Sequence, residues 1–464
     1  MKKLFLAVGC LVLIMSSIIA GIIFLPTHAP AHAHPADSSG DWPTYLYDQS
    51  RTGTNLNETT ITAATASQLQ LAWQFSTTGV VGASPTLANG VMYIGSWDGY
   101  EYAVDVATQQ QLWATYLGVS QQKKRCYGSY GIGVDSTAAV QDNVVYVGGG
   151  DGYMYALNAT DGSVLWQTLL GLPPYYNWSS PLLYNNTLYI GLAAYCDPPF
   201  VQGKVMALSM TDGSIVASVS LVPDGKTGAP VWGSAAVDAN TNTIYIASGN
   251  NGSQKISKQP YAEAIVALDA DTLAIKDYWQ IPKSQQVSDS DFGTTPTLFS
   301  VNGVDYIGAL NKNGIYYVLN RDDLAAGPVW EQPLSGNSEK VTGDNVSPSC
   351  YNNGIIYAGA AGGSNNGLSF GGSVTAFDAV SGTILWTFQT HGAMVSPVTC
   401  TSDLVIDDQG KTVEVRAAVD GTILFSYKTG ARIFGAALIS NGVLYVPSSD
   451  GNVYAFTVPQ ALIR

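Results

Sequence analysis

The chain has 464 residues, of which 46% are hydrophobic, only 12% are charged and 49 are glycine, a composition that excludes a disordered or coiled-coil protein. Lys and Arg number 20 against 34 Asp and Glu, so the net charge is −14 and nucleic-acid binding is not expected. Three of the four histidines, His28, His32 and His34, lie near the N-terminus. Only His391 remains for chemistry, which nearly excludes a zinc hydrolase and would force a Ser-His-Asp triad to use that residue.

An apolar run of 22 residues without a charge extends from Leu4 to Leu25. Because a signal-peptide core has about 7–15 residues and a bilayer span needs about 20, this length favours an uncleaved membrane anchor at 1–25. The alternative is a signal peptide cleaved after Ala31-His32-Ala33. Residues 26–41 are predicted to be a Pro/Ala-rich linker that precedes the main domain, 42–464. In both cases residues 35–464 are expected outside the cytoplasm, with the membrane contacted only through the N-terminal segment.

Four cysteines, Cys126, Cys196, Cys350 and Cys400, lie in this extracytoplasmic part. An even number of cysteines in an oxidising compartment predicts disulfides, and four cysteines allow three connectivities. No Cys-x-x-Cys-His motif occurs, so covalently attached c-type haem is not expected.

A short phrase recurs along the chain. Its clear copies are 98–105, 151–158, 203–209, 263–269, 313–320, 372–378 and 450–457, and a weaker copy is 411–418. Most copies follow a Ser-Pro-like strand and a Gly-x-x-Tyr-Ile/Val-Gly strand, and most lead through a turn into a strand that ends in tryptophan. Each unit therefore predicts four short strands separated by turns.

The spacing of the copies predicts the fold. Successive copies lie 39 to 60 residues apart, a period typical of propeller blades with four strands each. Eight copies predict an all-β propeller with eight antiparallel blades. The last copy lacks a fourth strand, whereas 69–75 is a tryptophan strand with no blade before it. We therefore predict that 69–75 completes the last blade and closes the ring, which removes an open sheet edge.

The phrase Asp-Gly-Tyr-Met-Tyr-Ala-Leu-Asn-Ala-Thr-Asp-Gly-Ser-Val-Leu-Trp at 151–166 resembles the repeat of the pyrroloquinoline quinone (PQQ) propellers, which include quinoprotein alcohol and polyvinyl alcohol dehydrogenases. The resemblance covers 42–458, including an entry segment with Trp42, Arg51 and Gly53. It implies the propeller fold but not catalysis, because non-catalytic members such as the outer-membrane assembly scaffold carry the same repeat.

Two segments of the fourth and fifth units match dehydrogenase sites. A Trp-Gly-Ser-Ala-Ala-Val-Asp run that continues to a Gly-Asn is similar to the segment in which a Trp stacks on the quinone and an Asn binds calcium, roles that fall on Trp232 and Asn250. In Asp-Ser-Asp-Phe-Gly, Asp291 matches the general base that takes the alcohol proton. The alternatives are purely structural. Trp232 would be a core residue of its blade and Asn250 a turn residue, and Asp289 and Asp291 would form an Asx-turn pair at the start of a strand.

Two later segments match residues that contact the quinone. Lys312, in Asn-Lys-Asn-Gly-Ile-Tyr-Tyr-Val-Leu-Asn-Arg, is similar to a Lys that reaches the o-quinone oxygens, where a cation stabilises the charge formed on reduction. Asn345, in Gly-Asp-Asn-Val-Ser-Pro, is similar to an Asn that touches the quinone. The alternatives are a solvated lysine at a strand end and an asparagine that caps a turn.

The sequence departs from the family in two places. The third unit lacks the Glu that serves as second calcium ligand, and only Asp197 can substitute for it, with a shorter reach. Calcium generally takes about six to eight oxygens, so this loss weakens the site. The vicinal Cys-Cys that covers the quinone is also missing. We predict instead a Cys126–Cys196 pair between long insertions on one face, and a Cys350–Cys400 pair between first strands of adjacent blades.

Two functions therefore remain. One is an extracytoplasmic quinoprotein-like dehydrogenase that oxidises an alcohol or polyol with PQQ and calcium and passes its electrons to a separate carrier. The other is a non-catalytic propeller that binds a protein or a polymer. The missing Glu and cysteines favour the scaffold. Convergence of Trp232, Asn250, Asp291 and Lys312 at one end of the central channel would favour the enzyme.

Overall fold

The computed structural model describes residues 40–120, 131–334, 345–365 and 368–459. Residues 1–33 and 34–464 are separate units, and the propeller lies in the second. No helix within the described ranges is long and apolar enough to span a membrane. The predicted anchor or signal peptide at 1–25 lies outside the described residues, as does most of the linker 26–41.

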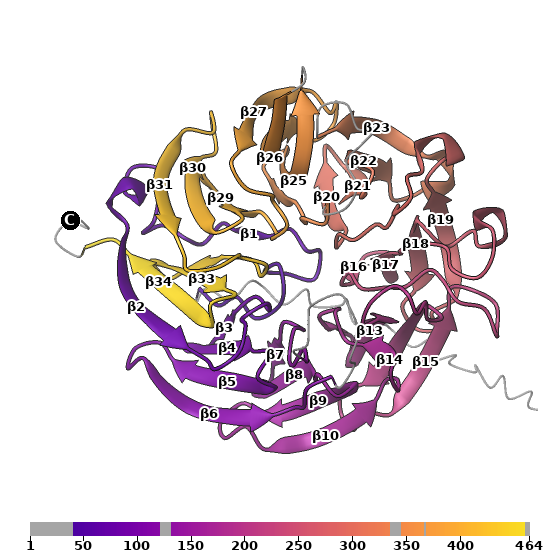
Figure 1. Ribbon diagram of the computed structural model, residues 1–464, viewed down its shortest axis with the longest axis horizontal. Coiled ribbons are helices and arrows are strands. Elements are labelled where there is room, and N and C mark those ends of the chain that lie inside the picture. The colour runs from indigo at the N-terminus through magenta and orange to yellow at the C-terminus, as the bar shows by residue number, and fades with distance from the viewer. Residues whose placement is uncertain (1–39, 121–130, 335–344, 366–367, 460–464) are drawn as a thin grey trace, which may run out of the picture. The chain divides into compact units, whose positions relative to one another are not determined.

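The first four blades follow one another along the chain (Figure 1). Blade 1 contains β3 (Thr86–Ala88), β4 (Val91–Gly95), β5 (Tyr100–Asp105) and β6 (Gln110–Tyr116). Blade 2 contains β7 (Ala139–Gln141), β8 (Val144–Gly148), β9 (Tyr153–Asn158) and β10 (Val164–Leu169). Blade 3 contains β12 (Leu182–Tyr184), β13 (Thr187–Ala194), β14 (Lys204–Ser209) and β15 (Ile215–Ser220), with the short β11 (Tyr175–Tyr176) paired to β13. Blade 4 contains β16 (Ala236–Asp238), β17 (Thr243–Ala247), β18 (Ala264–Asp269) and β19 (Ile275–Gln280).

The other four blades complete the ring. Blade 5 contains β20 (Thr297–Val301), β21 (Val304–Leu310), β22 (Ile315–Asn320) and β23 (Pro328–Pro333). Blade 6 contains β24 (Cys350–Asn352), β25 (Ile355–Asn365), β26 (Leu368–Asp378) and β27 (Ile384–Thr390). Blade 7 contains β28 (Thr399–Thr401), β29 (Leu404–Gln409), β30 (Thr412–Ala417) and β31 (Ile423–Lys428), and blade 8 contains β32 (Leu438–Ser440), β33 (Val443–Ser448), β34 (Asn452–Thr457) and β2 (Gln70–Ser76). Strand β1 (Thr54–Asn55) pairs in parallel with β28, and the 3-10 turns are η1 (Ala66–Gln68), η2 (Ile256–Lys258), η3 (Lys283–Gln285) and η4 (Leu324–Ala326).

The predicted eight-bladed fold and its closure are confirmed. Strand β2 pairs antiparallel with β34, from Gln70 opposite Thr457 to Ser76 opposite Asn452. Figure 1 shows the indigo β2 beside the yellow β34, so the two ends of the propeller meet in one sheet. The ring therefore leaves no unpaired blade edge at the junction.

In blades 1, 2, 5 and 6 the repeated tryptophan joins the blade to the next one. On the fourth strand of blade 1, Trp113 donates its indole N–H to the carbonyl of Ala159 in blade 2, at 2.9 Å. Gly162, in the turn that follows, has a φ of +71°, and a Cβ there would lie 2.7 Å from the Trp113 ring. Trp166, Trp330 and Trp386 make the same hydrogen bond to the following blade. The Asp-Gly and Leu-Trp parts of the repeat are therefore the two halves of one contact between blades.

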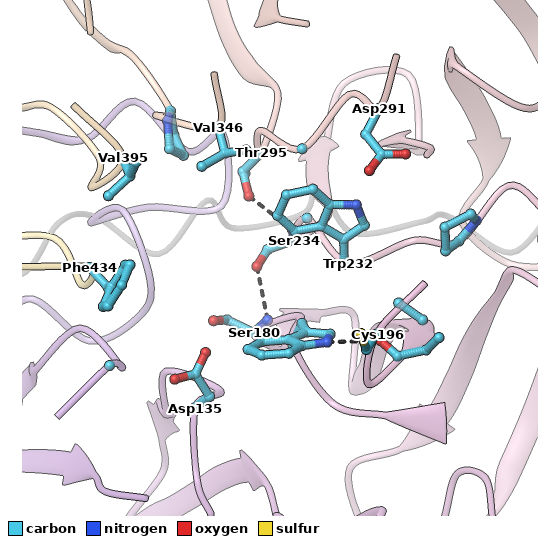
Figure 2. Close-up of a pocket in the computed structure, with 18 of the residues that line it drawn as sticks. Asp135, Ser180, Cys196, Trp232, Ser234, Asp291, Thr295, Val346, Val395 and Phe434 are labelled. Carbon is cyan, nitrogen blue, oxygen red and sulfur yellow. Dashed lines mark hydrogen bonds between the residues drawn. The ribbon is translucent and has the colours of Figure 1, made fainter. Parts of the chain in front are cut away.

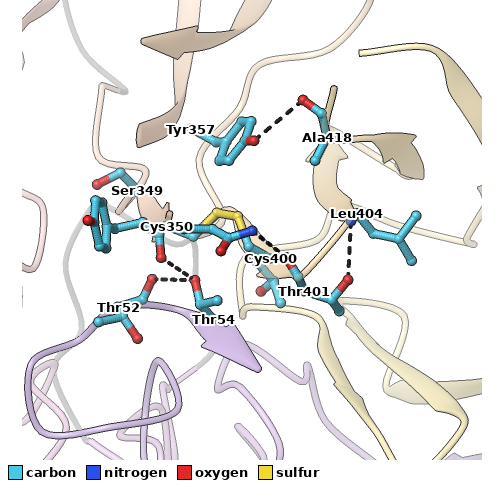
Figure 3. Close-up of a disulfide and its surroundings, with 12 residues drawn as sticks. Thr52, Thr54, Ser349, Cys350, Tyr357, Cys400, Thr401, Leu404 and Ala418 are labelled. Atoms are coloured by element: carbon cyan, nitrogen blue, oxygen red, sulfur yellow. Dashed lines mark hydrogen bonds between the residues drawn. A yellow bond between two sulfur atoms is a disulfide. The ribbon is translucent and has the colours of Figure 1, made fainter. Parts of the chain in front are cut away.

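A belt of hydroxyl groups joins the first strands around the channel. Each backbone N–H donates to the hydroxyl of the following blade, from Ala436 to Ser84, Ser84 to Thr137, Thr137 to Ser180, Ser180 to Ser234 and Ser234 to Thr295, at 2.7 to 3.0 Å. In blades 6 and 7 the equivalent positions are Pro348 and Pro397, which have no N–H to donate. There the predicted Cys350–Cys400 disulfide links the first strands instead, with the two Cα atoms 6.0 Å apart (Figure 3).

The N-terminal arm, residues 42–55, contacts all eight blades in ring order. Its partners are Leu87 for Trp42, Val140 for Pro43, Leu183 and Val237 for Gln49, Leu298 for Ser50, Tyr351 for Thr52, Cys400 for Gly53 and Ile439 for Asn55, each through a hydrogen bond of 2.7 to 3.0 Å. All of these partners lie in the innermost strands or beside them. The arm therefore spans one end of the channel.

Arg51 holds the middle of the arm and is fully buried. Its guanidinium donates to the carbonyls of Ala235, Pro181 and Tyr45, at 2.9, 3.1 and 2.6 Å, and to the Thr44 hydroxyl. One side chain thus ties the arm to blades 3 and 4.

We expect Arg51→Met to lower the free energy of unfolding by several kcal/mol, because it leaves three buried carbonyls without a donor and each such group costs roughly 1–3 kcal/mol. Urea unfolding followed by tryptophan fluorescence measures the change, with the exposed Lys428→Met as control. An Arg51→Met midpoint equal to that of the control would contradict the role of the arm.

Glu101 on β5 is fully buried, and neither of its carboxylate oxygens has a hydrogen-bond partner among the residues that the structure describes. Burial raises the pKa of Glu101 well above its ordinary value, so the folded protein favours the protonated acid. A raised carboxyl pKa contributes stability at low pH that is lost as the pH rises above the unfolded value of about 4.3 and through the folded pKa.

We therefore expect Glu101→Gln to unfold at a higher temperature than the wild type at pH 8, and the difference to shrink towards pH 5. Thermal unfolding between these two pH values measures it. If the unfolding temperatures of the variant and the wild type changed with pH in parallel, burial would not raise the pKa of Glu101.

Candidate functional site

A cavity of about 670 Å³ lies in the channel, lined by residues from every blade. Its ring consists of one residue per blade, two positions before the hydroxyl belt: Gly82, Asp135, Trp178, Trp232, Gly293, Val346, Val395 and Phe434. Figure 2 shows several of these side chains around the opening, with the belt hydroxyls of Ser180, Ser234 and Thr295 among them. Tyr45 of the arm also lines the cavity, so the arm forms part of its wall.

Five of the six residues predicted for catalysis, cofactor or metal binding line this cavity: Asp197, Trp232, Asn250, Asp291 and Lys312. They come from blades 3, 4 and 5. The sixth, Asn345, is fully buried behind Lys312, where its amide group donates to the Lys312 carbonyl at 3.3 Å and accepts from the Ala361 N–H at 2.9 Å. Asn345 therefore supports the backbone of the site without lining the cavity.

Lys312 bridges two carboxylates. Its ammonium nitrogen lies 2.7 Å from Asp291 Oδ2 and 3.0 Å from Asp289 Oδ2. The same nitrogen lies 5.2 Å from the centre of the Trp232 ring. The Lys312 side chain is 14% exposed, so it is an ion-paired residue of the cavity and not the solvated lysine of the alternative interpretation.

Asn250, in blade 4, holds residues 289–291 through three hydrogen bonds. Its backbone N–H donates to Asp291 Oδ1, and its side-chain amide donates to Asp289 Oδ1 at 2.7 Å. Its side-chain oxygen accepts from the Ser290 N–H at 2.9 Å. These three contacts hold Asp289 and Asp291 in one fixed orientation beside Lys312.

The two paired carboxylates differ in proton affinity. Burial raises the pKa of Asp291, and the Asp289 charge adds to that effect, although the Lys312 charge opposes it. Burial also acts on Asp289, but the charge of Lys312 and the hydrogen bond from Asn250 prevail and lower its pKa. Asp291, 5% exposed, is thus the carboxylate with the higher proton affinity, as a general base requires.

Two further acids surround the pair. Asp197 is exposed, and partial burial of its carboxyl together with the Asp291 charge raises its pKa to about 7. Glu263 is 4% exposed, and burial, with added effects of the Asp291 and Asp289 charges, raises its pKa to about 7. Within the described ranges, no three His, Cys, Asp or Glu residues are grouped to hold a metal ion by themselves.

Sequence reasoning missed Glu263, although a signal was present. Glu263 occupies the position that is glycine in all the other clear copies of the repeat, as in Gly99 and Gly152. Its φ of +52° is the left-handed conformation that favours glycine. A charged residue held in that conformation marks a local requirement other than folding.

Cys196 also lines the cavity and is disulfide-bonded. Its predicted partner, Cys126, lies outside the described residues.

The closed ring of eight blades and the cavity on its axis define a PQQ-type propeller, and the chain belongs to this family. The family model described as outer membrane protein assembly factor BamB matches residues 57–282 and 371–461. A second model, described as the β-propeller domain of glucose, ethanol and alcohol dehydrogenases, matches 222–348, the stretch that contains Trp232, Asn250, Asp291 and Lys312.

Relatives of both kinds are similar to the chain. A quinohemoprotein alcohol dehydrogenase of Comamonas testosteroni is 28% identical and matches 61% of this chain and 45% of its own length, so the chain spans about half of that relative. BamB of Salmonella typhimurium is 26% identical over 80% of this chain and 83% of its own length.

Solved structures show the same fold. The crystal structure of the Comamonas testosteroni quinohemoprotein alcohol dehydrogenase has a TM-score of 0.75 at 19% identity and covers 91% of this chain and 81% of its own. BamB of Moraxella catarrhalis has a TM-score of 0.58 at 16% identity, over 84% of this chain and 99% of its own.

We expect Lys312→Met to destabilise the fold at pH 7, because it leaves Asp291 buried without its cation. Breaking a buried ion pair from one side costs roughly 3–5 kcal/mol, and the half-exposed Asp289 places the expected loss at the lower end. Urea unfolding measures it, with the exposed Lys226→Met as control. Adding Asp291→Asn to Lys312→Met should recover part of the loss. Strictly additive losses would contradict the ion pair.

Proposed function

We propose that this chain is an extracytoplasmic quinoprotein-like dehydrogenase that oxidises an alcohol or polyol. The observation that carries the proposal is the convergence of Trp232, Asn250, Asp291 and Lys312 on one cavity. A scaffold that uses only its outer surface has no need of an ion-paired lysine and a buried base beside a tryptophan in its channel.

The cavity residues suit PQQ. The volume of about 670 Å³ is in the range of small-molecule sites, about 300–1,000 Å³. Trp232 offers an aromatic face, and the Lys312 ammonium lies beside that ring. Bound PQQ would accept the two electrons of the alcohol.

Asn250 and Asp197 would supply oxygen donors for calcium. Carboxylate and carboxamide oxygens suit this hard cation. Burial is the main cause of the raised pKa of Asp197, and the charges of Asp291 and Asp289 add to it, so a cation would offset part of that added negative charge. Calcium would add positive charge beside the quinone oxygens. Asp197 takes the place of the missing Glu in this proposal.

The chain's own residues have separate tasks. The Asp291 carboxylate accepts the proton of the alcohol hydroxyl, Asn250 orients that carboxylate, and Lys312 holds it in place and contributes positive charge. The arm and the ring residues shield the reaction from water. Because the sequence has no haem motif, the electrons leave to a separate carrier.

A non-catalytic scaffold that binds a protein or a polymer is the second candidate. It is supported by the extent of the BamB match, 83% of the relative's length, against 45% for the quinohemoprotein dehydrogenase. This candidate predicts that PQQ is not retained.

The test is to incubate the purified full-length chain with PQQ and calcium, measure the cofactor retained after gel filtration, and follow alcohol-dependent reduction of a dye. We expect about one PQQ per chain. Asp291→Asn should retain the cofactor but lose about a hundredfold or more in kcat, since it removes the base. The exposed Asp224→Asn should keep full turnover.

Absence of both retention and dye reduction would remove the enzyme and favour the scaffold. Full turnover of Asp291→Asn would remove the assigned base.

A further inference from the structure

A second charged group, which the proposed reaction does not use, lies on the cavity wall away from Asp291. Asp135 belongs to blade 2 and is the only charged residue among the eight ring positions. Figure 2 shows Asp135 and Asp291 on opposite sides of the opening, as their places in blades 2 and 5 of the ring require. The cavity thus has two separate polar ends.

One oxygen of the Asp135 carboxylate is fixed by a hydrogen bond. Its Oδ1 accepts the indole N–H of Trp97 at 2.6 Å. A Cβ on the neighbouring ring residue Gly82 would lie 2.3 Å from that oxygen, so the absent side chain makes room for the carboxylate. Within the described ranges, Oδ2 has no hydrogen-bond or ion-pair partner, and Asp135 lines the cavity. Burial raises the pKa of Asp135 to about 6, which leaves it mostly ionised at neutral pH.

Aromatic rings surround this carboxylate. Trp97 contacts it directly, and Trp178 occupies the next ring position, with its indole N–H fixed on the Ala194 carbonyl at 2.9 Å. Tyr45 of the arm lies near enough that the Asp135 charge, after burial, helps to raise the pKa of its hydroxyl. A carboxylate beside aromatic residues suits organic ammonium ions, which bind through ion pairing and through cation–π attraction to ring faces.

Arg432 is the other cation on the cavity wall besides Lys312 in the described ranges. Its guanidinium stacks 5.7 Å from the centre of the Phe434 ring and forms no ion pair with Asp135. Among the described residues, no cation therefore pairs with the Asp135 carboxylate.

We propose that Asp135 and the aromatic residues beside it bind an ammonium group of the substrate, which is an alcohol whose hydroxyl lies far enough from that group to reach Asp291 across the cavity. The ammonium subsite is inferred from the contacts of Asp135 and does not depend on the proposed reaction. The placement of the substrate hydroxyl at Asp291 rests on the proposed function.

The test compares choline with its neutral carbon analogue, 3,3-dimethylbutan-1-ol, by calorimetry on the full-length chain without PQQ. We expect choline to bind about tenfold tighter or more, since cation–π contacts and an ion pair act on it alone. Asp135→Asn, which keeps the acceptor for Trp97, should abolish this preference and leave the affinity for the neutral alcohol unchanged. The exposed Asp142→Asn should retain the preference.

Equal affinity of the wild type for the two ligands would overturn the subsite, and so would a choline preference that survives in Asp135→Asn. Because binding is measured without cofactor or dye, the two proposals fail separately. A choline preference that depends on Asp135, in a chain that retains no PQQ, would support the subsite and remove the dehydrogenase.

Discussion

The hydrogen bonds between residues 42–55 and the first strands of all eight blades are the constraint on which the rest of the structure depends. A propeller leaves an open channel on its axis, and in this chain the arm crosses one end of it, fixed by the buried guanidinium of Arg51. Tyr45 of the arm then forms part of the cavity wall. Closure by β2 and by the arm therefore makes both the ring and the cavity.

The ring is repetitive, but its chemistry is not. Blades 6 and 7 contribute Val346 and Val395 to the cavity and blade 8 contributes Phe434 with Arg432, whereas blades 2 to 5 contribute or position the carboxylates and Lys312. The hydroxyl belt follows the same division, because it is interrupted at two prolines where a disulfide replaces it. One half of the ring thus serves mainly as structure, and the other half carries the functional residues.

The sequence was sufficient for the fold, because each blade repeats one phrase whose glycine and tryptophan make the contact between blades. It also singled out Trp232, Asn250, Asp291 and Lys312, which lie in recognisable segments and line one cavity in the structure, while their roles stay a prediction. It was not sufficient for the arm, whose bonds run mostly through backbone carbonyls that no side-chain pattern marks. Asp135 was missed because a single acid at a ring position has no partner nearby in sequence, and its contact with Trp97 appears only when blades 1 and 2 pack together.

The central claim is that the channel cavity is a quinone site and not a remnant of the repeat. The most direct measurement is a crystal structure of the full-length chain grown with PQQ and calcium. We expect planar density against the Trp232 ring, with an oxygen within hydrogen-bonding distance of the Lys312 ammonium. A well-ordered cavity without such density, or PQQ bound only on the outer surface, would contradict this claim.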